Sequence, residues 1–238
     1  MTTHRLPGIP PGTLHDLTHP YAGSMSRPPG IAAAGHETRV DVVASHEKNG
    51  IQVSYFATAI HVGTHLDAPR HIIPGERVME DLRLDRFVTR AYVVDLDGFP
   101  ANAAVRRAHL EGPASELESG DALLLHTGWG ERHWGTEAYW ADSPYLADDA
   151  AEWFVERRLN LVGYDFFQEL EGKKPQIDPR NFTTHQIMLR HDVLNLEHLA
   201  NLRPIAAKWV WLLCLPLRIA GAEGAATRAI AVLPDEAG

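Results

Sequence analysis

Three histidines and one aspartate are concentrated in one short segment of the chain, His61-Val-Gly-Thr-His-Leu-Asp-Ala-Pro-Arg-His71. Imidazole nitrogens and carboxylate oxygens are the ligands of many catalytic Zn²⁺, Mn²⁺ and Fe²⁺ sites, which keep one coordination position open. A closed structural zinc site would favour several cysteines, and this chain has a single one. The segment therefore predicts a divalent metal site held by His61, His65 and Asp67.

The elements around this segment decide which of its side chains share a face. Gly63 and its neighbours are poor helix formers, and the preceding residues 51–60 are rich in the β-branched and aromatic types that favour strands. If that strand continues, the alternation of side chains places His61, His65 and Asp67 on one face. Gly63 would then leave space between the two imidazoles.

His71 follows Pro69, so the chain is expected to turn before it. This turn places the imidazole beside the metal ligands rather than among them. A side chain whose ordinary pKa is ~6.5 can take a proton from water and return it to a leaving group. We therefore predict that His71 is the general acid and base of a hydrolytic reaction.

A second candidate pair lies far along the chain. His185 belongs to a helical pattern over residues 184–191, and Glu197 follows the strand-like residues 193–196. Spacing alone does not distinguish a metal ligand here from a structural histidine. The ten remaining histidines of the fourteen, His198 among them, show no comparable pattern and are expected to be mostly solvated or structural.

Composition excludes several classes of partner. The net charge of −9 over 238 residues opposes binding to nucleic acid or to anionic membranes. The longest apolar run, residues 209–217, is far shorter than the ~18–20 residues that span a bilayer. Cys214 lies within that run and is expected to be a buried, inert thiol. The first thirty residues show no signal peptide, so we expect a cytoplasmic protein.

Many strand-like runs and few helical patterns predict a mixed α/β fold, with residues 1–238 forming a single domain. Helices are expected at residues 104–110, 148–159 and 184–191. Strands are expected at residues 39–44, 51–60, 91–96, 122–126, 161–164, 193–196, 209–217 and 227–233.

Aromatic side chains could form the walls of a pocket for an aryl substrate, although core packing explains any one of them equally well. The candidates are Tyr21, Trp129, Trp134, Tyr139, Phe166 and Phe167.

The histidine segment resembles the signature H-x-G-T-H-x-D-x-P-x-H of the metal-dependent cyclase family, which includes bacterial kynurenine formamidases and isatin hydrolases. The likeness extends through most of the chain, with supporting matches at residues 14–18, 125–129, 161–165 and 215–218. Every fixed position of the signature is matched, by His61, Gly63, Thr64, His65, Asp67, Pro69 and His71.

The resemblance implies a swivelling β/β/α fold and a homodimer or higher homo-oligomer. It also implies that His185 and Glu197, twelve residues apart, complete a second metal position, with Asp67 bridging the two. One or two Zn²⁺ or Mn²⁺ ions per subunit are therefore expected.

The resemblance further implies hydrolysis of a small, aryl amide by metal-activated water, as in a kynurenine formamidase. The alternative within the family is the opening of a cyclic amide or lactone, as in an isatin hydrolase. One departure from the formamidases concerns residues 166–175, where two aromatics and a charged segment replace small polar residues. If this segment lines the site, it reshapes the substrate pocket.

Two rival hypotheses remain outside the family. A serine hydrolase of the nucleophile-elbow type is disfavoured, because the chain contains no G-x-S-x-G segment. A protein of a different class, in which the metal is a structural staple and nothing is hydrolysed, would be distinguished by metal analysis and an activity assay reversed by a chelator.

Overall fold

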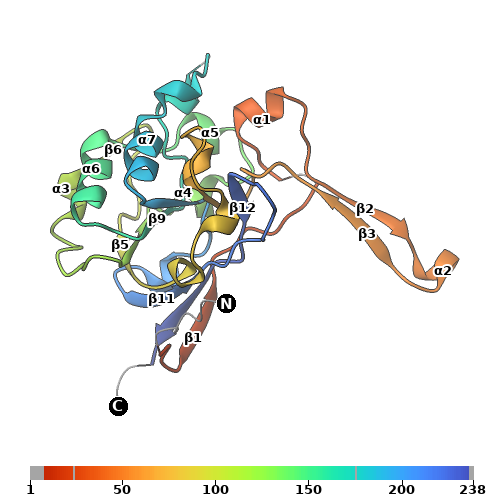
Figure 1. Ribbon diagram of the computed structural model, residues 1–238, viewed down its shortest axis with the longest axis horizontal. Helices are drawn as coiled ribbons and strands as arrows, with labels where there is room; N and C mark the ends of the chain where they lie inside the picture. The colour runs from red at the N-terminus through yellow and green to blue at the C-terminus, as the bar shows by residue number, and fades with distance from the viewer. Residues whose placement is uncertain (1–7, 24, 175, 236–238) are drawn as a thin grey trace.

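The computed structural model describes residues 8–23, 25–174 and 176–235, and its central feature is a nine-stranded sheet (Figure 1). The order of the strands across the sheet differs from their order along the chain. In space the strands are β1 (Gly12–Asp16), β13 (Ile230–Pro234), β11 (Trp209–Leu213), β5 (Val88–Asp95), β7 (Ala122–His126), β9 (Leu161–Tyr164), β10 (Leu194–Glu197), β4 (His65–Asp67) and β12 (Gly224–Ala226).

The four central strands of the sheet, from β5 to β10, run parallel to one another, and the flanking strands pair antiparallel. Because side chains alternate along a strand, the sheet has two buried faces. Leu123 and Leu125 of β7 face one apolar cluster, and Leu124 faces the other. The second of these clusters also contains residues of the flanking strands β4, β11, β12 and β13, because the sheet curls around it.

Two helices cover the other face of the sheet. They are α6 (Asp148–Glu156), which contributes Trp153 and Phe154 to the apolar cluster, and α7 (Thr183–Arg190), which contributes Met188. Both helices were expected from helical patterns in the sequence, the first of them from its apolar periodicity. The first ends three residues earlier than expected, close to Arg158, whose backbone has a left-handed φ of 53°.

The remaining helices are short. They are the α-helices α1 (Pro29–Ala33), α2 (His46–Asn49), α3 (Arg107–Leu110), α4 (Trp129–His133) and α5 (Ala138–Ala141), and the 3₁₀ helices η1 (Pro69–His71), η2 (Met79–Asp81), η3 (Leu84–Phe87), η4 (Glu171–Lys173), η5 (Pro179–Asn181) and η6 (Arg203–Ile205).

Among the expected elements whose bounds differ from the observed ones, three show a larger change. The helix expected at 104–110 begins only at Arg107, because Ala104 and Val105 form strand β6, which pairs with β8 (Tyr145–Leu146). The strand expected at 209–217 ends at Leu213, and Pro216, which has no N–H to donate, lies beyond it. The strand expected at 51–60 ends at Ala57, short of the histidine segment.

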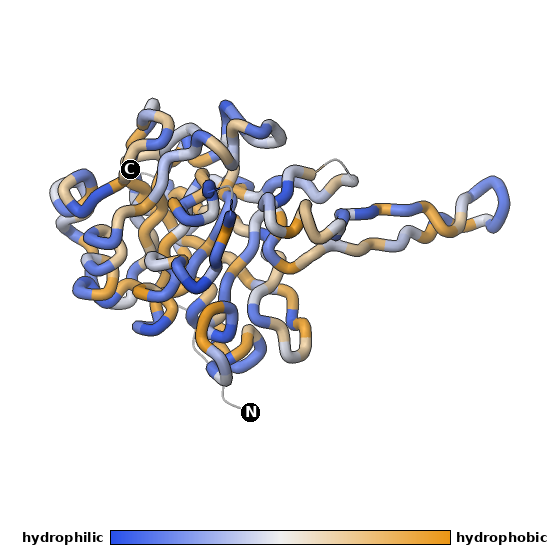
Figure 2. Tube along the Cα trace, turned by 90° about the horizontal axis from the view of Figure 1, so that it is seen from above, coloured by the Kyte–Doolittle hydropathy of each residue, from blue (hydrophilic) through white to orange (hydrophobic). Residues whose placement is uncertain are grey.

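A two-stranded arm projects from the body of the molecule (Figure 1). It consists of β2 (Arg39–Ala44) and β3 (Val53–Ala57), with α2 at its tip. Figure 2 shows the same arm from above, with hydrophobic residues along its length and hydrophilic ones at its tip. Its exposed apolar side chains are Val40, Val42, Val43, Ile51, Val53, Tyr55 and Phe56.

The curled sheet with helices on one face confirms the mixed α/β class expected from the sequence. Within the described ranges, every helix is too short or too polar to traverse a lipid bilayer.

Candidate metal centre

Strand β4 carries two of the predicted ligands at the centre of a three-stranded part of the sheet. His65 and Asp67 are two residues apart on β4 and therefore share a face. On one side, β10 places Glu197 directly opposite His65 in the antiparallel register. On the other side, β12 places Gly224 opposite Asp67. The register of β10 against β4 thus joins a distant carboxylate to the histidine segment.

His61 reaches the same place from a turn rather than from a continued strand. The chain leaves β3 of the arm at Ala57 and joins the nine-stranded sheet only at His65, so the expected alternation of side chains from residue 61 to 67 is wrong. Gly63 has a φ of 66°, which L-residues rarely adopt, and a Cβ there would displace the end of the Met25 side chain. The turn brings His61 Nδ1 to 2.8 Å from Asp67 Oδ1.

The Asp67 carboxylate is the point at which the predicted ligands converge. Its Oδ1 lies 3.4 Å from His65 Nε2, and its Oδ2 lies 3.4 Å from His185 Nε2. Glu197 forms the second point of convergence, with Oε1 3.0 Å from His185 Nε2 and Oε2 3.7 Å from His65 Nε2. The structure therefore brings together all five residues that the sequence analysis named as ligands.

The donor atoms fit a divalent metal in number and type. Asp67, His185 and Glu197 offer ligand atoms that all lie within 4.8 Å of one another. Among the described residues the buried Oδ2 of Asp67 has no hydrogen-bond partner, as expected for an oxygen that serves a cation. His65 Nδ1 lies 2.8 Å from the carbonyl oxygen of Gly63, so its proton is directed there and Nε2 keeps its lone pair for the centre.

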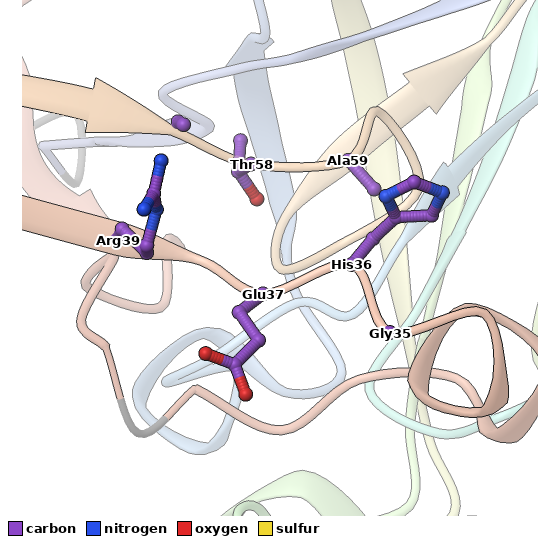
Figure 3. Close-up of a pocket in the computed structure, with 7 residues that line it drawn as sticks. Gly35, His36, Glu37, Arg39, Thr58 and Ala59 are labelled. Carbon is purple, nitrogen blue, oxygen red and sulfur yellow. The ribbon is translucent and has the colours of Figure 1, made fainter.

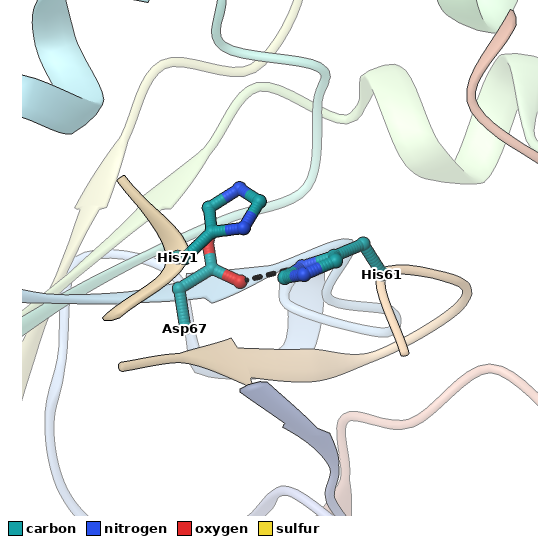
Figure 4. Close-up of side chains that lie close together, drawn as sticks. All are labelled: His61, Asp67 and His71. Carbon is teal, nitrogen blue, oxygen red and sulfur yellow. Dashed lines mark hydrogen bonds and ion pairs between the residues drawn. The ribbon is translucent and has the colours of Figure 1, made fainter. Parts of the chain in front are cut away.

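His71 lies beside this centre, on the 3₁₀ helix η1 that begins at Pro69. Figure 4 shows the rings of His71 and His61 close to the Asp67 carboxylate, with a dashed line joining His61 to the carboxylate. The rings of His71 and His61 have centroids 3.9 Å apart, and that of His71 lies 5.5 Å from the His185 ring. The three residues in Figure 4 also form a group that could hold a metal, so the geometry permits His71 as a ligand as well as an acid and base.

His61 and His71 differ in their affinity for a proton. Burial disfavours a charged His61, but the adjacent Asp67 carboxylate outweighs burial and raises the pKa of His61 to about 9. Burial dominates at His71 and lowers its pKa to about 4, despite the attraction of Asp67. At neutral pH His71 is therefore a neutral imidazole that can accept a proton, whereas His61 is protonated until a metal displaces that proton.

Metal binding should therefore release a proton at neutral pH. Because a protonated imidazole cannot bind a metal, we expect the apparent metal affinity to rise up to about tenfold per pH unit from pH 7 until about pH 9. Isothermal titration calorimetry in buffers of different ionisation enthalpy measures the number of protons released. An affinity that is constant over this pH range would contradict the His61 assignment.

The predicted aromatic wall residues occupy different environments. Phe166 is fully buried and packs on Tyr164, with ring centroids 5.6 Å apart, so its surroundings are those of a core residue. Trp129 is also buried, and its ring lies 4.1 Å from His133. Phe167 packs edge-on against Trp140.

Tyr21 contacts the histidine segment itself. Its hydroxyl donates a hydrogen bond of 2.8 Å to the carbonyl oxygen of Val62. Its ring packs against Phe56, with centroids 5.5 Å apart, at the root of the arm. Tyr21, Phe56 and the buried His19 also line a cavity of about 580 Å³ beside this segment.

Another cavity lies at the root of the arm, away from the five converging ligands. Figure 3 shows Glu37, Arg39 and Thr58 along its wall, with His36 at one end. Its volume is about 530 Å³, and no residue of the metal centre lines it. We therefore assign no chemistry to this cavity.

Gln168 and Glu169 contact the centre, although the sequence did not identify them as site residues. Both belong to residues 166–175, the segment that differs from the formamidases. Glu169 Oε1 accepts hydrogen bonds from the His185 backbone N–H at 2.9 Å and the Thr184 hydroxyl at 2.5 Å, and it lies 2.8 Å from His185 Nδ1. Gln168 Nε2 donates to Glu197 Oε1. The difference between residues 166–175 and the formamidase sequences was the one indication that this segment could line the site. The segment's final residue, Pro175, lies outside the described residues.

Glu169 fixes the orientation of His185 and should therefore set metal affinity. We expect Glu169→Gln to weaken metal binding at the position served by His185 by about 10–100-fold, because the neutral amide is a poorer acceptor for the imidazole N–H. Competition with a chromophoric chelator measures this affinity. The matched control is Glu152→Gln, which alters an exposed carboxylate on α6. Equal affinities in the two variants would contradict this role.

A third missed residue, His198, follows Glu197 directly. It is fully buried, and its Nε2 lies 3.5 Å from Glu197 Oε2. The expectation that this histidine lacks site geometry is wrong. The alternation of side chains along β10 could not identify His198, because that strand ends one residue earlier, at Glu197.

Known proteins resemble this chain over most of its length. A kynurenine formamidase of Bacillus cereus is 27% identical over 219 residues, covering 90% of this chain and 95% of the relative. An isatin hydrolase of Roseibium aggregatum is 25% identical over 235 residues, covering 90% of this chain and 88% of the relative.

The fold is shared with solved structures. An isatin hydrolase bound to the product analogue thioisatinate superposes with a TM-score of 0.80 at 23% identity, covering 93% of this chain and 92% of the other. The model of the cyclase family matches residues 15–168, which include the whole histidine segment. The chain therefore belongs to the cyclase family.

Proposed function

We propose that this chain is a metal-dependent hydrolase of small amides, most similar in reaction to a kynurenine formamidase. The observation that carries this proposal is the convergence of three imidazoles and two carboxylates on one buried centre, next to a neutral His71. The relatives named kynurenine formamidase and isatin hydrolase support the amide class. We further propose that the whole chain acts as one hydrolase domain.

We assign His61, His65 and Asp67 to one metal position, and Asp67, His185 and Glu197 to a second. When bound, a divalent metal supplies Lewis acidity that lowers the pKa of water from ~16 towards ~7 and polarises a carbonyl group. His71 then accepts the proton of the attacking water at a ring nitrogen and returns it to the leaving nitrogen. Both Zn²⁺ and Mn²⁺ suit imidazole and carboxylate ligands, so both are candidates.

Turnover of three substrates tests the proposal. We expect the metal-loaded protein to hydrolyse N-formylkynurenine, to lose activity with a chelator, and to regain it with Zn²⁺ or Mn²⁺ supplied separately. Isatin and a panel of lactones test the alternative of ring opening. Robust ring opening without formamidase activity would overturn the first choice of substrate, and a metal that stabilises the fold without any turnover would overturn the enzyme proposal.

We also propose that the arm packs on a second copy of the chain. An isolated two-stranded ribbon is marginally stable in water, and Val40, Val42 and Phe56 lie on one exposed face of it. The body of the same chain also exposes the apolar side chains Leu215 and Leu217, which line one cavity and which such a ribbon could cover. One chain therefore carries both halves of an apolar contact.

The oligomer should depend on the apolar face of the arm. We expect the wild type to sediment as a dimer or larger assembly, and the double variant Val40→Asp/Val42→Asp to sediment as a monomer. The control Val40→Thr/Val42→Thr keeps the β-branched shape and introduces no charge. Analytical ultracentrifugation at several concentrations measures the mass. A wild type that is monomeric throughout would exclude this interface.

A further inference from the structure

His198 presents an unused hydrogen-bonding atom to the metal centre. Its side chain is fully buried, and its Nε2 has no hydrogen-bond partner among the described residues. The nearest carboxylate oxygen, Glu197 Oε2, lies 3.5 Å away. Because a buried polar atom without a partner is costly, such an atom next to a reaction centre points to a partner that arrives with the substrate.

Tyr139 determines which ring nitrogen of His198 carries the proton. The phenol oxygen of Tyr139 lies 2.8 Å from His198 Nδ1, and both side chains are buried. We assign the proton of this contact to the phenol, because among the described residues its oxygen has no other hydrogen-bond partner. His198 in its neutral form then carries its own proton on Nε2. In this tautomer that nitrogen is a hydrogen-bond donor rather than a metal ligand, although the donor atoms of His65, Glu197 and His198 lie close enough together to hold an ion.

The backbone holds His198 in an uncommon conformation. Its φ of 55° is left-handed, a region that residues other than glycine seldom adopt, although histidine enters it more often than most. The hydroxyl of Thr64, within the histidine segment, donates a hydrogen bond of 2.7 Å to the His198 carbonyl oxygen. A strained residue that is tied to the metal-binding turn in this way is typical of a functional position.

Aromatic rings surround the same imidazole. The ring of Trp140 lies 5.2 Å from that of His198, and the ring of Trp134 lies 5.7 Å from it. Trp134 in turn stacks on His19, with centroids 3.9 Å apart and planes 9° apart. His19 lines the cavity that Tyr21 also lines, so the aromatic group connects His198 with that cavity.

We propose that His198 is a catalytic residue whose Nε2–H donates a hydrogen bond to the carbonyl oxygen of the amide substrate, with Tyr139 fixing the required tautomer. This inference rests on the proposed amide hydrolysis and assigns a new role within that site. Negative charge develops on this oxygen as water adds to the carbonyl carbon. A donor already placed in a buried site stabilises that charge without reorganisation.

Two variants and one spectroscopic measurement test the proposal. His198→Asn tolerates the left-handed backbone, and Tyr139→Phe keeps the buried ring while removing the phenol. In each variant we expect kcat for N-formylkynurenine to fall by about 10²–10³-fold, with KM and bound zinc unchanged. The control His191→Asn alters an exposed histidine and should have wild-type kinetics. Loss of zinc from His198→Asn would make His198 a ligand and overturn the proposal.

The tautomer can be read without any substrate. Long-range ¹H–¹⁵N correlation spectra of the zinc-loaded protein distinguish a protonated from an unprotonated ring nitrogen, and the signals missing in His198→Asn identify this residue. We expect the proton on Nε2 in the wild type, and a larger fraction of the Nδ1-protonated form in Tyr139→Phe. A proton on Nδ1 in the wild type would overturn the proposal. An inactive wild type would instead overturn the proposed function, whereas an active wild type with an equally active His198→Asn would overturn only the role of His198.

Discussion

Replacing Asp67 with asparagine should abolish both metal binding and turnover. The carboxylate contacts His61 through one oxygen and faces His185 through the other, so both proposed metal positions depend on it. Lewis-acid stabilisation is worth several kcal/mol, and about 1.4 kcal/mol corresponds to a factor of ten in rate, so we expect kcat/KM to fall at least about 1000-fold. Metal content by mass spectrometry and amide hydrolysis should fall together.

The control for this substitution is Asp235→Asn, which makes the same chemical change at an exposed position. Circular dichroism should show that both variants are folded. If Asp67→Asn retains its metal and a substantial part of its activity, the carboxylate does not join the two positions, and the proposed centre is wrong.

Replacing His71 with alanine should separate chemistry from metal binding. General acid–base catalysis typically contributes about 10²–10⁴-fold, so we expect kcat to fall by that factor while the bound metal is retained. The low pKa of His71, a consequence of burial, leaves the imidazole neutral and able to accept a proton at pH 7. Steady-state kinetics of the metal-loaded variant measures this loss, and added imidazole should restore part of the rate.

The matched control is His191→Ala, which removes an exposed imidazole at the end of α7. Full turnover by metal-loaded His71→Ala would exclude the acid–base role. Loss of metal from the same variant would show that His71 acts as a ligand beside His61 and Asp67, a group that the geometry also permits.

Local patterns predicted much of the fold. The strands β2, β7 and β9 have the bounds expected from their β-branched and apolar runs, because these runs pack in the same way wherever the sheet places them. The ends of other elements depended on contacts that no local pattern contains. Ala104 and Val105 form a strand only because β8, about forty residues away, pairs with them.

The metal centre also has a part that the sequence predicts and a part that it does not. The types and spacing of His61, His65 and Asp67 were sufficient to predict a hard metal site, since imidazole and carboxylate chemistry does not depend on the fold. The pairing of His185 with Glu197 required the family resemblance. The position of Glu197 opposite His65 follows from the register of β10 against β4. That register is set by contacts between strands more than a hundred residues apart in the sequence.

The sequence by itself determined which chemistry this protein carries: a His/carboxylate metal segment with a spare histidine, in an acidic chain with a single cysteine. Only the tertiary structure decided which groups orient those ligands. The side chain of Glu169 contacts His185 and that of Tyr139 contacts His198, and the two approach the centre from separate elements. No regular spacing in the sequence reveals a hydrogen bond between such residues. The bond depends on how distant segments pack, and not on the spacing of residues within any one segment.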